Sequence, residues 1–279
     1  MTRKAVFLDV DGTLIDDYGR VPESAARAVR EARTNGHLVF LCTGRSMVEL
    51  TASVFKVDVD GFVLSSGAYV QVGRDVLLHE HLTPGAVRHV ADFFDAHGGG
   101  YYFQAHDAVY ASPQARDLLR STVAASVRAD PAFDEVDHGL LTYVDTITVD
   151  VDPLTKVITK AIFFDSVVPL DDLRTAFPEF LIVPASVTVF GTNAGEITVP
   201  GINKATGIDV VLDHVGIDLA DTIGIGDSYN DLEMLEHVAV GIAMGNAPQP
   251  VRDIADEVTA PTTEDGIRLA FLRHGLIAE

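Results

Sequence analysis

The chain contains 279 residues, of which 20 are basic and 41 are acidic, so its formal net charge is −21. This charge disfavours nucleic acids and anionic membranes as partners, because both are polyanions. A single cysteine, Cys42, excludes an intramolecular disulfide, and no apolar stretch approaches the ~18 residues of a membrane span. The N-terminus also lacks the apolar run of a signal peptide, so we expect a soluble protein of the cytoplasm.

The first third of the chain alternates short apolar segments with helical patterns. The apolar run at 5–10 predicts a strand. Pro22 suits a first helical turn and Gly36 suits a helix stop, which together predict a helix over 22–36. The elements expected next are a strand at 37–43, a helix near 46–56 and a strand at 62–66. Strands that are apolar throughout and alternate with helices are typical of a parallel sheet covered on both faces.

The middle of the chain has a different pattern. Residues 69–82 predict a hairpin that turns at Gly73, on which His79 and His81 share one face. A polar hairpin face is favoured over a metal site as the reason for this pair. The elements expected next are helices at 84–97, 113–127 and 169–176, and paired strands within 101–112, 156–165 and 181–190. This mixture predicts a separate α+β module inserted into an α/β domain.

The last third returns to the alternating pattern. Its predicted elements are a helix near 203–215, a strand at 221–227, a helix near 229–236, a strand at 239–244, and helices near 248–254 and 264–273. The predicted organisation is a core made of residues 1–82 and 191–279, with an inserted domain at 83–190.

Polar residues stand next to the ends of several predicted core elements. Asp9 and Asp11 follow the first strand and Thr43 follows the second. Lys204 opens a helix, and Asp227 follows a later strand. Ligands of an open parallel sheet bind outside the carboxyl ends of its strands, so we expect these side chains to converge there. Taken singly, Thr43 and Lys204 are better explained as a helix cap and a solvated charge.

Together these segments resemble a known family. The stretches DVDGTL (9–14), TGR (43–45), NK (203–204) and GDSYND (226–231), in that order, are similar to the four motifs of the haloacid dehalogenase superfamily. The closer resemblance is to its Cof-like branch of phosphatases, and it extends to SSGAYV (65–70) and to residues 197–208 and 239–267. It implies an α/β fold with a Rossmann-like parallel-sheet core and an inserted α+β cap domain. Asn203 stands where the motif often has Ser, and Asn caps a helix equally well.

The resemblance also implies roles for individual residues. Asp9 is the implied nucleophile, and Asp11 the acid that protonates the leaving group and later deprotonates water. The implied ligands of a Mg²⁺ ion are the Asp9 side chain, the Asp11 backbone carbonyl, Asp227 and Asp231, the last directly or through water. The residues implied for the transferring phosphate are Val10, Thr43, Gly44, Lys204 and Asn230. Arg45 and Ser66 are candidate substrate contacts, although Ser66 stands where the branch commonly has Asn.

The resulting hypothesis is a Mg²⁺-dependent phosphatase that acts on a small phosphorylated metabolite, such as a sugar phosphate, through an aspartyl-phosphate. The nearest alternative is a phosphomutase, in which the same intermediate passes its phosphoryl group to a sugar hydroxyl. A non-catalytic metabolite-binding protein is a further alternative. The intact set of Asp9, Asp11, Thr43, Lys204 and Asp227 argues against it, because a sensor needs no nucleophile together with its acid.

Overall fold

The computed structural model describes residues 2–16, 18–129, 143–184 and 193–278. The chain forms two compact units, the first made of Met1–Arg45, Leu50–His79 and Asn203–Glu279, and the second of Ser46–Glu49 and Glu80–Ile202. The chain therefore passes between the units after Arg45, after Glu49, after His79 and after Ile202. The boundaries expected from the sequence pattern followed residues 82 and 190, and residue 190 lies outside the described ranges.

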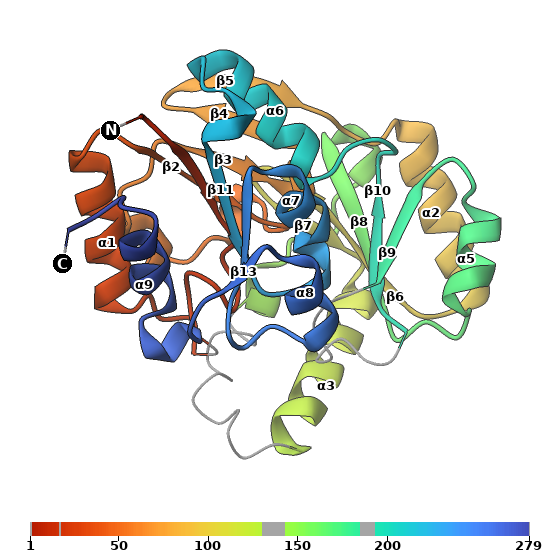
Figure 1. The fold of residues 1–279 in the computed structure, drawn as a ribbon. Coiled ribbons are helices and arrows are strands. Elements are labelled where there is room, and N and C mark those ends of the chain that lie inside the picture. Colours follow the sequence, from red (N-terminus) through yellow and green to blue (C-terminus); the bar gives the residue numbers. More distant parts are fainter. Residues whose placement is uncertain (1, 17, 130–142, 185–192, 279) are drawn as a thin grey trace. The chain divides into compact units, whose positions relative to one another are not determined.

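An eight-stranded sheet forms the centre of the first unit, in the order β13-β12-β11-β1-β2-β3-β4-β5 (Figure 1). Its strands are β1 Ala5–Leu8, β2 Leu38–Cys42, β3 Gly61–Leu64, β4 Tyr69–Val72, β5 Asp75–His79, β11 Thr222–Gly226, β12 Val240–Ala243 and β13 Glu257–Val258. The strands from β13 to β3 run parallel, and β4 and β5 form an antiparallel hairpin. The predicted Rossmann-like core is thereby confirmed. Gly73 lies in the hairpin turn with a φ of 56°, a conformation that glycine adopts without steric cost.

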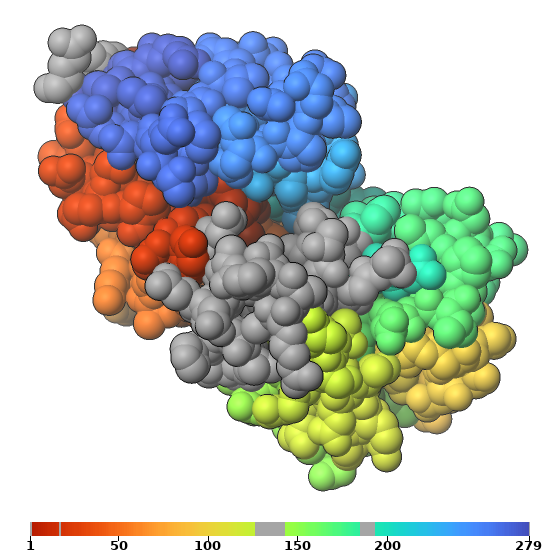
Figure 2. Space-filling view, turned by 90° about the horizontal axis from the view of Figure 1, so that it is seen from below, coloured from red at the N-terminus to blue at the C-terminus, as the bar shows by residue number. Residues whose placement is uncertain are grey.

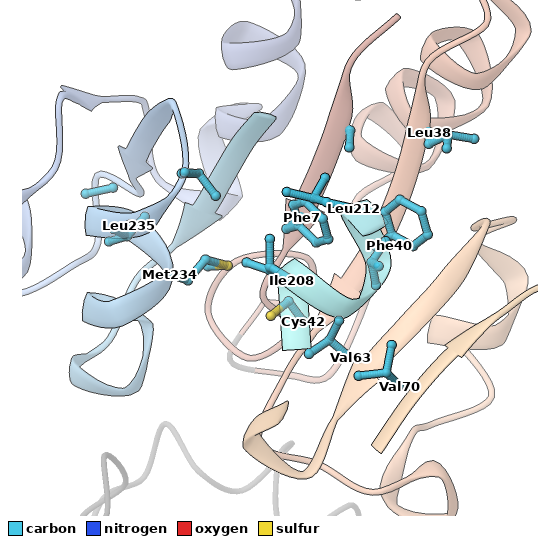
Figure 3. Packing of buried hydrophobic residues seen from close by; sticks show 14 of the residues in the cluster. Phe7, Leu38, Phe40, Cys42, Val63, Val70, Ile208, Leu212, Met234 and Leu235 are labelled. Carbon is cyan, nitrogen blue, oxygen red and sulfur yellow. The ribbon is translucent and has the colours of Figure 1, made fainter. Parts of the chain in front are cut away.

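Helices cover both faces of this sheet. They are α1 Glu23–Thr34, α6 Lys204–Val215, α7 Leu232–His237, α8 Gln249–Ile254 and α9 Gly266–Arg273. On one face, Ile208 of α6 and Met234 of α7 pack in a buried cluster with Phe7, Phe40 and Cys42 of the strands (Figure 3). The rings of Phe7 and Phe40 stack with their centroids 5.3 Å apart. This packing explains why β1 and β2 are apolar at consecutive positions and not only at alternate ones.

The opposite face of the sheet is covered by α1 and α9, which pack against each other. The side-chain amide of Asn35 donates to the backbone oxygen of Leu276 at 2.8 Å. Figure 2 shows the resulting contact between the N-terminal segment, in red, and the C-terminal segment, in blue. Val6 and Leu8 alternate with Phe7 along β1 and are also fully buried, so both sheet faces contribute to the core.

The expected helix near 46–56 is wrong. This segment contains two short 3₁₀ turns, Met47–Glu49 and Val54–Lys56. The Glu49 carboxylate accepts hydrogen bonds from the Ser46 amide at 2.8 Å and from the Tyr143 hydroxyl at 2.7 Å. Because Tyr143 belongs to the second unit, this bond fixes Ser46–Glu49 there, and a continuous helix would carry the segment away from it.

The second unit is built on a five-stranded antiparallel sheet in the order β7-β6-β8-β10-β9. Its elements are β6 Gly100–Ala105, β7 Val109–Ala111, β8 Ile158–Phe164, β9 Leu181–Pro184, β10 Gly195–Thr198, α2 Pro84–His97, α3 Pro113–Ala129 and α5 Leu170–Ala176. One apolar cluster includes Val90 and Phe94 of α2 with Phe163, and another includes Leu119 of α3 with Ile162. The predicted α+β insertion is therefore present, and the pairing of β10 with β8 explains why this unit continues past residue 190. None of the helices in the described ranges is both long and apolar enough to cross a membrane.

Candidate active site

The candidate site lies at the carboxyl ends of the central strands of the first unit. β1 has β2 on one side and β11 on the other, so the chain order reverses direction at β1, which is where ligands bind in such sheets. Asp9 follows β1 directly and its amide donates to the oxygen of Ile225 at 2.9 Å. The residue is nearly fully buried, with 3% relative exposure. A carboxylate held in this way requires charge compensation.

Lys204 provides part of that compensation. It is the first residue of α6, whose start is fixed by a capping box between Asn203 and Thr206. The Thr206 amide donates to the Asn203 side chain at 3.0 Å, so the expected cap by Asn203 is confirmed. The Lys204 ammonium, itself only 1% exposed, lies 2.6 Å from Asp9 Oδ1 and 2.5 Å from Asp231 Oδ1.

Asp231 is fully buried and uses both of its carboxylate oxygens within the protein. Oδ1 accepts from Lys204, and Oδ2 accepts from the amides of Asp227 and Ser228, both at 3.0 Å. This arrangement orients the lysine and the backbone at Asp227 at the same time. It favours an indirect, orienting role for Asp231 over direct metal ligation.

Three carboxylates therefore share a small volume. Ligand oxygens of Asp9, Asp227 and Asp231 lie within 4.8 Å of one another. Burial, and then the nearby Asp231, raise the pKa of Asp9 well above its usual range although Lys204 opposes the shift. Burial and Asp231 also raise the pKa of Asp227, to about 7. Burial by itself lowers the pKa of Lys204, but Asp231 and Asp9 outweigh it, so that pKa is raised.

One lysine thus does not neutralise this site. A hard divalent cation with oxygen ligands fits the donor set and would remove the repulsion between the carboxylates. Asp9 and Asp227 are the side chains placed to contact it. Asp231 is less available, because its two oxygens accept from the Lys204 ammonium and from two backbone amides, whereas Asp227 has only longer contacts, from Thr13 at 3.2 Å and from Asn246 at 3.4 Å. Among the described residues, neither His79 nor His81 belongs to a group of metal-ligand side chains of this kind. His79 instead ends β5, with its ring edge against Tyr69 at a centroid distance of 5.1 Å.

Gly12 and its neighbours position Asp227. Gly12 has a φ of 76°, and a Cβ at this residue would lie 2.3 Å from Asp227 Oδ2, so a larger residue would strain the backbone and displace the Asp227 carboxylate. The Thr13 hydroxyl donates to Asp227 Oδ1 at 3.2 Å. The Asn246 side-chain amide donates to the Gly12 oxygen at 2.9 Å and approaches Asp227 Oδ2 at 3.4 Å. Thr262 also donates to the Gly12 oxygen and contacts the Asn246 side chain.

Thr13, Asn246 and Thr262 were not among the residues singled out from the sequence. Asn246 and Thr262 lie in the stretch 239–267, where the family resemblance continues, but both are uncharged and neither follows a charged motif residue. That continuing resemblance was the one available signal.

Asp11 is placed differently from Asp9. Its side chain is 50% exposed, and Arg45 holds it with two hydrogen bonds: Nε to Oδ2 at 2.7 Å and Nη2 to Oδ1 at 2.6 Å. This two-point geometry fixes the direction of the carboxylate. Arg45, which sequence reasoning offered as a substrate contact, therefore contacts the proposed acid in this structure.

The other expected phosphate-binding residues lie near the same strand ends. Thr43 is buried, and its amide donates to the Val63 oxygen at 2.9 Å. The Val10 side chain is buried in the core, and its carbonyl accepts the amide of Leu14 at 3.0 Å. Asn230 accepts a hydrogen bond from the Ser228 hydroxyl at 2.6 Å. Gly44 lies between Thr43 and Arg45 on the loop that follows β2.

Cys42 lies beside this site but has no sign of reactivity. It is buried, and burial raises the pKa of its thiol. A neutral buried thiol acts as a small apolar side chain, as its position in the cluster of Figure 3 indicates.

Comparisons with known proteins agree with this geometry. Residues 6–271 match the family model described as haloacid dehalogenase-like hydrolase. YkrA of Bacillus subtilis, provisionally named a phosphatase, is 28% identical over 99% of this chain and 100% of its own length. YcsE of the same bacterium, a 5-amino-6-(5-phospho-D-ribitylamino)uracil phosphatase, is 27% identical over 98% of this chain and 96% of its own. The structure of the sugar phosphatase BT4131 superposes with a TM-score of 0.77 at 26% identity, covering 98% of this chain and 100% of that one.

Proposed function

This chain belongs to the haloacid dehalogenase-like hydrolases as a phosphoric monoester hydrolase, and we propose that it releases phosphate from a small phosphorylated metabolite through an aspartyl-phosphate on Asp9, with Mg²⁺. The observation that supports this most directly is the buried bridge from Lys204 to Asp9 and Asp231, beside Asp227. A buried carboxylate with a lysine and a cation site around it is arranged to meet a phosphate dianion.

In the first step, an oxygen of Asp9 attacks the phosphorus atom and the bond to the ester oxygen breaks. The departing alkoxide takes a proton from the Asp11 carboxyl group, and the phosphoryl group is then attached to Asp9. In the second step, the Asp11 carboxylate takes a proton from water, whose oxygen attacks phosphorus. The bond to Asp9 breaks and inorganic phosphate is released.

The chain's own residues carry most of the positioning. Lys204 holds Asp9 Oδ1 in place and adds positive charge beside it. We assign the binding of the transferring oxygens to Thr43, the Gly44 amide, Lys204, Asn230 and Val10. Arg45 fixes the direction of Asp11.

Mg²⁺ would be held by the Asp9 side chain, the Asp11 backbone carbonyl and Asp227, with Asp231 acting through water. Once bound, the ion supplies positive charge that offsets the repulsion between the nucleophile and the phosphate oxygens. The raised pKa values of Asp9 and Asp227 support this assignment, because a nearby cation favours the charged form of both groups.

The substrate class follows from the family and from the charge. The relatives YcsE and BT4131 are named for a ribitylaminouracil phosphate and for sugar phosphates, so small phosphate monoesters are the proposed substrates. The net charge of −21 disfavours nucleic acids and anionic membranes as partners. We propose a cytoplasmic location, where such metabolites occur.

The deciding experiment measures phosphate release from a panel of phosphorylated metabolites, with p-nitrophenyl phosphate included, in Mg²⁺ and after chelation. We expect release from at least one small monoester, loss of activity with chelator and recovery with Mg²⁺. Analysis of the sugar product separates hydrolysis from isomerisation by a phosphomutase. Full activity after exhaustive chelation would contradict the metal assignment, and no release from any monoester would contradict the function.

A further inference from the structure

A strained turn lies directly beside the proposed phosphate-binding loop. Ser65, Ser66 and Gly67 follow β3 and have φ values of 51°, 57° and 99°. Two consecutive residues with side chains thus adopt the left-handed conformation, which is costly for any residue with a Cβ atom. Such a conformation persists only where the surrounding structure enforces it.

The turn is held by the loop that follows β2. The Ser66 amide donates to the Thr43 oxygen at 3.0 Å, and the Ser65 amide donates to the Arg45 oxygen at 2.9 Å. On its other side, Gly67 lies against the residue that caps α6, since a Cβ at Gly67 would be 2.0 Å from the Asn203 oxygen. The turn is therefore packed between the segments that carry Thr43 and Lys204.

The bond from Ser66 has a consequence for Gly44. The Thr43 carbonyl and the Gly44 amide belong to one planar, trans peptide group, so they point in opposite directions. Fixing the Thr43 oxygen toward Ser66 therefore fixes the Gly44 N–H away from Ser66. That N–H is one of the donors assigned above to the transferring phosphate.

We propose that Ser66 is a positioning residue for phosphate binding: its left-handed backbone aims the Gly44 amide through the Thr43 carbonyl. This inference rests on the proposed phosphatase function. It assigns the effect of Ser66 to its backbone conformation and not to its hydroxyl group.

The test is a series of substitutions at Ser66, ranked by tolerance of positive φ: Gly and Asn accept it readily, Ala less so, and the β-branched Val least. For each folded variant, calorimetry gives the Kd of inorganic phosphate in the presence of Mg²⁺. Steady-state kinetics with p-nitrophenyl phosphate give kcat and KM. We expect Ser66→Val to weaken phosphate binding and to lower kcat by about tenfold or more, because small misplacements of binding groups are costly. Ser66→Gly and Ser66→Asn should retain the phosphate affinity of the parent. The affinity of Ser66→Ala should lie between theirs and that of Ser66→Val.

Gly73→Val is the matched control. Gly73 has a similar φ of 56°, and a Cβ added at this position would meet no atom within 4 Å. This variant should lose thermal stability while its phosphate affinity stays at the parent value. If Ser66→Val does not fold, the comparison of Ser66→Ala with Ser66→Gly carries the same test.

Two results would overturn the inference. One is equal phosphate affinity across the folded Ser66 variants. The other is an equal loss of phosphate affinity in the Gly, Asn and Val variants, which would assign the effect to the hydroxyl group. A parent protein that neither binds phosphate nor hydrolyses any ester would remove both this inference and the proposed function, and so differs from a flat Ser66 series in an active enzyme.

Discussion

Arg45 holds the carboxylate of Asp11 with two hydrogen bonds of 2.7 and 2.6 Å, while Lys204 contacts Asp9, two residues earlier in the chain, at 2.6 Å. The two aspartates of one short motif are thus held by two different cations. Asp9 is buried, whereas the Asp11 side chain is half exposed. This difference matches the two proposed roles, because a nucleophile needs a fixed position and an acid–base group must exchange protons with water.

Changing Asp9 or Asp11 to asparagine should impair different parts of the reaction. Asp9→Asn removes the nucleophile, so no phosphoenzyme and no product should form with any substrate. Asp11→Asn removes the acid and base, but p-nitrophenolate leaves without a proton. Mixing Asp11→Asn protein with p-nitrophenyl phosphate should therefore give a burst of at most one phenolate per site and then slow turnover. Rapid-mixing absorbance measures the burst.

Sugar phosphates are the control in that experiment, because their alkoxide leaving groups need the proton. Asp11→Asn should therefore lower kcat for sugar phosphates more than for the aryl ester. An equal decrease in kcat for both substrates, with no burst, would count against the acid–base role of Asp11. A burst from Asp9→Asn would place the nucleophile on another carboxylate.

Lys204→Met should reduce both activity and metal-free stability. Loss of one charged contact to the transition state lowers kcat roughly 10²–10³-fold. The buried carboxylates of Asp9 and Asp231 also lose their shared partner, which lowers the free energy of unfolding by about 3–5 kcal/mol. Chemical denaturation with and without Mg²⁺ measures this, and Mg²⁺ should restore part of the loss because it supplies positive charge at the same place.

A matched control exists in the second unit. Lys160 is equally buried and lies 2.8 Å from Glu196. Lys160→Met should lose stability as well, but Mg²⁺ should not restore it. Recovery of both variants by Mg²⁺ would show that the ion acts elsewhere than beside Lys204.

The stability of the metal-free protein should fall as the pH rises toward 8. The pKa of Asp227 is raised to about 7 from an ordinary value of 3.8, and the pKa of Asp9 is raised too. A carboxyl group whose pKa is raised by folding stabilises the protein fully below its unfolded pKa, and this contribution is lost as the pH passes through the folded pKa. The increase in melting temperature on adding Mg²⁺ should therefore be larger at pH 8 than at pH 6.

Asp227→Asn tests the origin of that pH dependence. The variant keeps the shape of the side chain but has no proton to lose, so the difference between pH 6 and pH 8 in the chelated protein should shrink. An unchanged difference would assign the pH dependence to groups outside this carboxylate cluster.

Asn246→Ala should weaken Mg²⁺ binding although Asn246 is not one of the proposed ligands of the ion. Asn246 bonds the Gly12 oxygen and approaches Asp227 Oδ2, and loss of such an outer partner typically costs about 10–100-fold in metal affinity. Calorimetric titration of the chelated protein with Mg²⁺ measures the effect. Gln249→Ala, at the exposed start of α8, is the control and should bind Mg²⁺ like the parent. Unchanged affinity in both variants would leave Asn246 with a purely structural role.

Much of the fold is determined by stretches of consecutive residues. The continuous apolar runs predicted the parallel strands, because both sheet faces are buried. Asn203 predicted the start of α6 through a cap that needs only residues one turn away. Gly73 predicted the hairpin turn in the same local way. The positions of Asp9 and Lys204 at the ends of core elements predicted that the two side chains would converge, and they lie 2.6 Å apart.

Other features depend on contacts between distant segments, and for these the local pattern was insufficient or misleading. The segment near 46–56 reads as a helix, but Glu49 is bonded to Tyr143, which lies 94 positions further along the chain. Thr262 reaches Gly12 across 250 positions, and neither residue type signals that contact. The hydrogen bonds from Arg45 to Asp11 and the strained pair Ser65–Ser66 likewise depend on contacts with the loop that follows β2. The sequence by itself thus determined the elements and the chemical groups of the site, because these depend on near neighbours, whereas only tertiary packing decided which group orients which.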